Sequence, residues 1–175
     1  SQQNTARTYW QRWIENIPLH GRGQSYSEKI LQRYSEGERQ IFDVPYLLRC
    51  VKLAKEAREH LDDPLVLELA VWFHRIIYDP QRDDNFLKSA DVVREVVGRL
   101  QLPDKFKTAV EHIEQLSETP HIKQLSGTPQ GDSMYLWDIH RSPLASSEAE
   151  FDDLVDKMEK TSGEQGPAIV EQHLV

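Results

Sequence analysis

The chain has 175 residues, of which 29 are Asp or Glu and 21 are Lys or Arg, so its formal net charge is −8. This length predicts one domain of ordinary size with a single core. The excess of acid argues against a general nucleic-acid-binding protein, which needs a basic surface, and no apolar run approaches the roughly 18 residues of a membrane span.

Apolar residues recur at helical spacing in the N-terminal part of the chain. One stripe at steps of three and four residues predicts a helix over residues 5–17, followed by a break at Gly21 and Gly23. Two further helices are predicted over residues 27–35 and 44–61, and Pro45 is tolerated in the first turn of the second. The first stripe consists of Trp10, Trp13, Ile14 and Ile17.

The most apolar segment of the chain predicts a central helix over residues 65–78. Asp63 is placed to cap its N-terminus, and Pro64 suits the first helical position. Because this helix is apolar nearly all round, we expect it to run through the middle of the core.

The C-terminal half also reads as helical, and no run of alternating β-branched residues indicates a strand. The predicted elements are helices over 85–100 and 104–118, a loop over 119–131, a short apolar piece over 134–139 and a helix over 146–160. The fold class is therefore all-α, a bundle of about six to eight helices. Residues 1–160 would form a single domain, and residues 161–175 a C-terminal tail or partner-binding arm.

Cys50 is the only cysteine. An internal disulfide is excluded, which favours an intracellular protein, in the cytoplasm or the interior of an organelle. The chain begins with Ser1 and shows no apolar signal segment, and this leaves open a removed transit peptide. Since Cys50 lies on an apolar helical face, we expect it in the core; a nucleophile would need surroundings that lower its pKa.

Two polar residues, His74 and Arg75, interrupt the predicted central helix. An arginine is almost never fully buried unless it is paired. Two alternatives follow: Arg75 lies at an exposed edge of the helix, or it faces an acidic partner inside a pocket.

Several short blocks around this helix resemble the predicted metal-dependent phosphohydrolases of the HD superfamily. The resemblance covers roughly residues 8–158 and implies an HD-domain-like helical bundle. The blocks that carry it are YSEGER (34–39), ELAVWFH (68–74), IYDP (77–80), Asp84-Asn85 and Ser89-Ala90.

The chain departs from the family at most of the metal-ligand positions. The family's first two metal-binding histidines fall on Phe42 and Tyr46, and its His-Asp pair becomes His74-Arg75. Of the family's ligand types, only His74 and, downstream, Asp138 are kept. A catalytic divalent ion needs several His and carboxylate ligands with an open position for water, and Arg75 puts a permanent positive charge in their place.

These departures predict a vestigial pocket formed by Phe42, Tyr46, His74, Arg75 and Asp138. We expect it to hold no metal or other cofactor and to contain no catalytic residue. In place of the ion, Arg75 would form a buried salt bridge with Asp138, while Phe42 and Tyr46 fill the space of the imidazoles.

We therefore hypothesise that the chain is a pseudoenzyme that serves as a structural or protein-interaction subunit. The terminal segments are expected to lie outside the compact core, and an acidic surface suits basic protein partners; a small ligand in the remnant pocket is a further option. The alternative is a metal-dependent phosphohydrolase acting on a nucleotide or small phosphate ester. Its metal would be held by His74, Asp138 and further ligands such as His112, His121 or His140.

Overall fold

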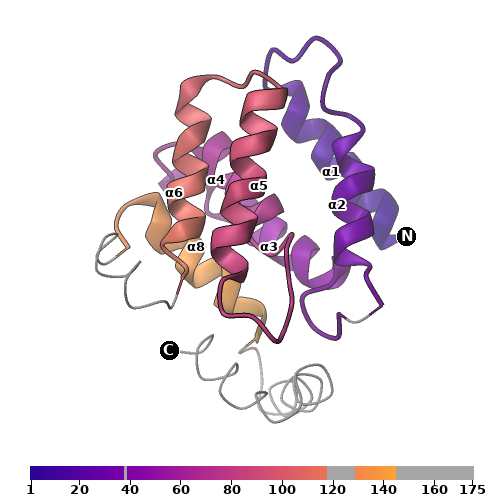
Figure 1. The fold of residues 1–175 in the computed structure, drawn as a ribbon. Coiled ribbons are helices and arrows are strands. Elements are labelled where there is room, and N and C mark those ends of the chain that lie inside the picture. Colours follow the sequence, from indigo (N-terminus) through magenta and orange to yellow (C-terminus); the bar gives the residue numbers. More distant parts are fainter. Residues whose placement is uncertain (38, 118–128, 145–175) are drawn as a thin grey trace.

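The computed structural model describes residues 1–37, 39–117 and 129–144 (Figure 1). Within these residues there are seven α-helices, three short 3₁₀-helices and no strand, which confirms the all-α prediction. The α-helices are α1 (Gln2–Glu15), α2 (Tyr26–Tyr34), α3 (Val44–Glu56), α4 (Pro64–Phe73), α5 (Asn85–Arg99), α6 (Thr108–Glu114) and α8 (Asp132–Arg141). The helix predicted over 146–160, the tail over 161–175 and most of the predicted loop over 119–131 lie outside the described residues.

Helix α4 is the centre of the bundle. Every residue from Val66 to Phe73 is buried, and α4 packs against α3, α5, α6 and α8 (Figure 1). The side chain of Asp63 accepts a hydrogen bond from the Val66 amide at 3.3 Å, so the predicted cap is confirmed. With 10 residues, α4 is too short for a bilayer, and no other helix of the described residues is long and apolar enough.

Helix α4 ends at Phe73, whereas the sequence predicts helix as far as Tyr78. The backbone carbonyls at its end are taken by side chains from another part of the chain. The Tyr34 hydroxyl donates to the carbonyl of Trp72 at 3.0 Å, and the Arg39 guanidinium donates to two carbonyls beyond the helix. These groups satisfy the carbonyls without a further helical turn, so the prediction was wrong over the last five residues.

Two other predicted helices are shorter than expected. The segment 44–61 is divided into α3 and a 3₁₀-helix over Arg58–His60, and the segment 104–118 begins as a 3₁₀-helix over Asp104–Lys107 before α6. The 3₁₀ form is common where a helix begins or ends. The short apolar piece predicted over 134–139 belongs to the longer helix α8.

The N-terminal helix is part of the core, so the expectation that this segment lies outside it is wrong from Ala6 onward. Ala6 is 1% exposed, and the predicted stripe of α1 is buried together with Ile17, which follows the helix. The indole of Trp10 donates to the carbonyl of Gly23 at 2.9 Å, and that of Trp13 donates to Leu65 at 3.0 Å. These bonds tie α1 to the loop before α2 and to the start of α4.

Candidate functional site

Buried polar and aromatic side chains gather where α4 ends. They come from the loop before α3, the first turn of α3, the residues after α4, the first turn of α5 and the end of α8. Four of the five residues predicted for the vestigial pocket are among them. We call this group the Arg75 cluster; it consists of Phe42, Tyr46, His74, Arg75, Phe86 and His140.

Arg75 lies between two phenylalanine rings. Its guanidinium carbon is 3.8 Å from the ring centroid of Phe42 and 4.3 Å from that of Phe86, and the residue is 2% exposed. Arg75 therefore does not lie at an exposed edge of the helix. Burial lowers its pKa, an effect opposed by the nearby hydroxyls of Tyr46 and Tyr78, and a guanidinium stays charged in proteins. A desolvated cation over an aromatic face is stabilised by about 2 kcal/mol or more.

Asp138 lies outside the Arg75 cluster. Its side chain is 67% exposed and accepts from Nη2 of Arg141 at 3.1 Å, one turn along α8. Since Ile139 and His140 are the buried neighbours, Asp138 faces away from the core. Among the ion pairs of the described residues there is none between Arg75 and Asp138, so the expected salt bridge is wrong.

Tyr46 connects the two histidines of the cluster. Its hydroxyl is 2.7 Å from the backbone carbonyl of His140 and 3.1 Å from Nε2 of His74. Nδ1 of His74 lies 2.7 Å from the carbonyl of Val71, which can only accept, so Nδ1 carries the proton of the neutral ring and Nε2 is an acceptor. The single proton of the Tyr46 hydroxyl is thus shared between two acceptors, and Nε2 of His74 already has a partner.

Burial fixes the charge of the cluster at neutral pH. It lowers the pKa of His74 to about 3 and that of His140 well below the usual value, with the charge of Arg75 as a further cause in both. Burial also raises the pKa of the Tyr46 hydroxyl. Both imidazoles and the phenol are therefore neutral, and Arg75 is the charged member.

A second arginine, Arg39, holds the backbone around the cluster. Its guanidinium donates to the carbonyls of Phe42 at 2.9 Å, Arg75 at 2.7 Å and Ile76 at 2.9 Å. Carbonyls at and beyond a helix C-terminus carry partial negative charge, which favours a cation there. The sequence does not indicate this role of Arg39, because a hydrogen bond to a distant backbone carbonyl leaves no pattern in the sequence.

The remaining sequence candidates have ordinary structural surroundings. Cys50 is fully buried, and burial raises the pKa of its thiol to about 12, which confirms it as a core residue. Nδ1 of His112 lies 2.6 Å from the hydroxyl of Ser133 at the start of α8. His121 lies outside the described residues. Within the part of the chain that the structure describes, no three His, Cys, Asp or Glu side chains are grouped so as to hold a metal ion.

No protein-family model, no curated protein and no solved structure matches the chain. The resemblance to the HD superfamily therefore stays a prediction.

Proposed function

We propose that this chain is a non-catalytic binding protein on an HD-like helical scaffold, a structural or protein-interaction subunit of a larger assembly. One observation carries the proposal: the guanidinium of Arg75 lies between the rings of Phe42 and Phe86, 3.8 and 4.3 Å from their centroids. The resemblance to the HD phosphohydrolases would place the first metal-binding histidine at Phe42 and, at Phe86, the glutamate that follows Asp-Asn in that family.

The residues of the Arg75 cluster do not fit a divalent metal ion. Phe42 has no donor atom, and the phenol of Tyr46 is protonated because burial raises its pKa. Nε2 of His74 is already in contact with Tyr46, and Asp138 points outward. An added divalent cation would also face the fixed charge of Arg75 at short range in a medium of low dielectric.

The same residues favour a role for the cluster in stability. The Tyr46 hydroxyl lies between the His74 ring and the backbone carbonyl of His140. Together with the rings on either side of Arg75, this contact makes the fold rigid where α3, α4, α5 and α8 meet. A rigid scaffold suits a subunit that presents its surface to a partner.

Metal analysis and a phosphatase screen test the proposal. We expect the purified chain to hold no stoichiometric transition metal, and manganese or zinc to leave its thermal midpoint unchanged relative to chelator. We also expect no hydrolysis of nucleotides or small phosphate esters in manganese beyond that of the variant His74→Gln. About one tightly bound metal per chain, or turnover lost in His74→Gln, would instead establish the phosphohydrolase alternative.

A further inference from the structure

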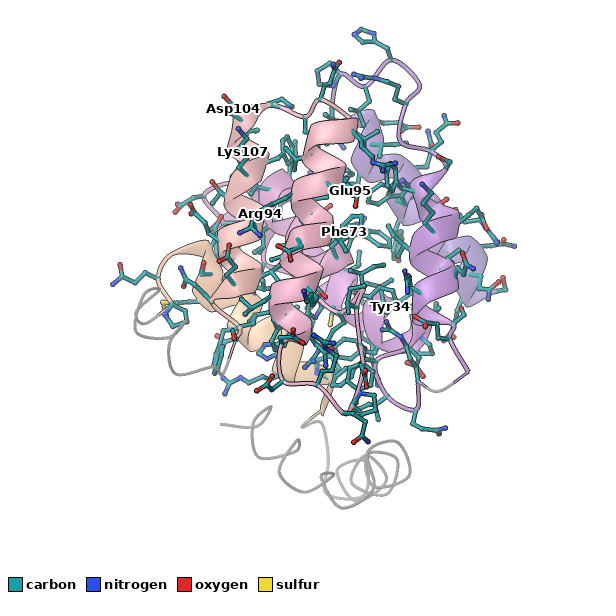
Figure 2. All side chains as sticks on the ribbon, in the orientation of Figure 1. Tyr34, Phe73, Arg94, Glu95, Asp104 and Lys107 are labelled. Atoms are coloured by element: carbon teal, nitrogen blue, oxygen red, sulfur yellow. The ribbon has the colours of Figure 1, made fainter. Side chains whose placement is uncertain are left out.

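A groove of about 380 Å³ lies between α2 and α5, and its lining includes Phe73, the last residue of α4. In Figure 2 the labelled Phe73 lies between these two helices, with Glu95 close to it on α5. The groove is near the lower end of the volumes that enclose a small molecule, so it offers room for a few apolar side chains. Its apolar lining consists of Ile30, Phe73, Ile76, Ile77, Val92 and Val96.

The rim of this groove carries an excess of positive charge. Lys29 and Arg33 lie one helical turn apart on α2 and are both exposed. On the opposite wall, Arg99 pairs with Glu95 at 2.6 Å, so the one acid of the rim is neutralised. In the ion pairs recorded for the described residues, neither Lys29 nor Arg33 takes part. The ammonium of Lys29 lies over the ring of Tyr26, 4.8 Å from its centroid, which leaves its charge without an acidic partner among these ion pairs. Two cations that no carboxylate of the described residues neutralises therefore face a ligand.

A second groove, of about 590 Å³ between α5 and α6, shows the opposite arrangement. Its two cations are matched by its own acids: Arg94 pairs with Glu114 at 2.7 Å and Lys107 pairs with Asp104 at 3.3 Å (Figure 2). A third acid, Glu111, also lines this groove, so its net charge is −1 and it gives no indication of an acidic partner. It supplies a control surface on the same molecule.

We propose that the α2–α5 groove binds an acidic amphipathic helix of a partner protein. The inference rests on the proposed binding function and names the class of partner. Apolar side chains of such a helix would contact the partly exposed Ile77 and Val92 of the lining. Carboxylates one turn apart would face Lys29 and Arg33. This is the usual mode in which an apolar helix face is held in a groove between helices.

The charge of the groove is opposite to that of the whole chain. A net charge of −8 favours basic partners at long range, but salt screens such effects beyond about 8 Å at physiological ionic strength. At contact distance, the two exposed cations of α2, Lys29 and Arg33, therefore decide which charge the groove accepts. Lys29 and Arg33 lie one helical turn apart along α2, so a partner segment with several carboxylates suits them better than a compact anion does.

Selection from a library of random 16-residue peptides, displayed against the intact chain, tests the proposal. We expect enriched peptides to be rich in Asp and Glu, with apolar residues at helical spacing. Their Kd, measured by fluorescence anisotropy, should rise about tenfold or more in Arg33→Glu and further in the double variant with Lys29→Glu. Lys107→Glu reverses one charge in the α5–α6 groove and should leave the Kd unchanged.

Three results of the selection and the binding assay would overturn the proposal: no enriched peptide, enriched peptides that are basic, or a Kd that Arg33→Glu does not change. A fourth would be displacement of the bound peptide by the fatty-acid anion dodecanoate at a lower concentration than by unlabelled peptide. Self-association of the chain that Arg33→Glu abolishes would assign the groove to a second copy. Circular dichroism of each variant separates loss of binding from loss of folding. If the purified chain were found to hold a metal, the proposed function would be contradicted, whereas the result of the peptide-binding experiment would still apply to the groove.

Discussion

Arg39 donates a hydrogen bond from Nη1 to the backbone carbonyl of Arg75 at 2.7 Å, so one buried arginine fixes the backbone that carries the other. The same guanidinium binds the carbonyls of Phe42 and Ile76. The loop before α3 and the chain after α4 are thereby held together by a single side chain. Both guanidinium groups lie where carbonyl oxygens and aromatic faces offer negative potential.

Replacing Arg39 should destabilise the fold strongly. In Arg39→Ala three buried carbonyls lose a charge-assisted partner, and we expect the free energy of unfolding to fall by about 3–5 kcal/mol. Arg39→Lys keeps the charge but cannot reach three carbonyls with one planar fork, so its loss should be intermediate. Urea unfolding measures both, with the exposed Arg33→Ala as a control that should change the midpoint little. An Arg39→Ala variant as stable as the parent would contradict these hydrogen bonds.

Arg75 and Asp138 should respond very differently to substitution. Arg75→Ala removes a cation between two rings and leaves a cavity, at a cost of about 2–4 kcal/mol. Asp138→Ala removes an exposed carboxylate paired with a residue of the same helix, so it should have little effect. If the two residues were coupled as a buried ion pair, chemical denaturation would show comparable losses for both and a large interaction energy in the double variant.

The sequence predicted the core far better than the site. The uniformly apolar helix α4, its Asp63 cap and the tryptophan stripe of α1 depend on local pattern, and the structure has all three. It also brings Phe42, Tyr46, His74 and Arg75 together.

The partner of Arg75 could not be predicted in the same way. A charged residue in an apolar helix suggests a carboxylate, and nothing in the sequence indicates that the rings of Phe42 and Phe86 lie against the guanidinium. Asp138 faces solvent or the core according to how α8 is rotated about its axis. The apolar segment within α8 is short and includes the exposed Met134, so its pattern does not determine that rotation. The end of α4 likewise depends on Tyr34 and Arg39, which are distant in sequence.

Introducing the metal ligands of the HD phosphohydrolases, which the chain resembles only in short sequence blocks, should not create a stable site. The triple variant Phe42→His, Tyr46→His and Arg75→Asp puts polar groups into a core adapted to rings and a cation. We expect each change to cost about 1–3 kcal/mol when no metal is present. Thermal unfolding in chelator gives the loss, and Phe42→Leu, which keeps an apolar side chain, serves as the control. If the triple variant had the same thermal unfolding midpoint as the parent in chelator, the Arg75 cluster would tolerate the new polar side chains at these three positions.

The buried histidines should make stability fall as the pH is lowered. His74 has an ordinary pKa of 6.5 when unfolded and about 3 in the fold, and that of His140 is also lowered. Below about pH 6.5 the unfolded chain binds protons that the folded chain does not, so the free energy of unfolding declines as the pH falls toward 3 and is fully recovered above 6.5.

Each histidine can contribute a slope of up to about 1.4 kcal/mol per pH unit in this window. Urea unfolding between pH 5 and 7 would measure the slope, which should be smaller in His74→Gln and smaller still when His140→Gln is added. Leu69→Ala, a buried apolar change in α4, should lower stability equally at every pH. Carboxylates titrate mainly at lower pH, so a slope that His74→Gln leaves intact between pH 5 and 6.5 would show that His74 is not held neutral beside Arg75.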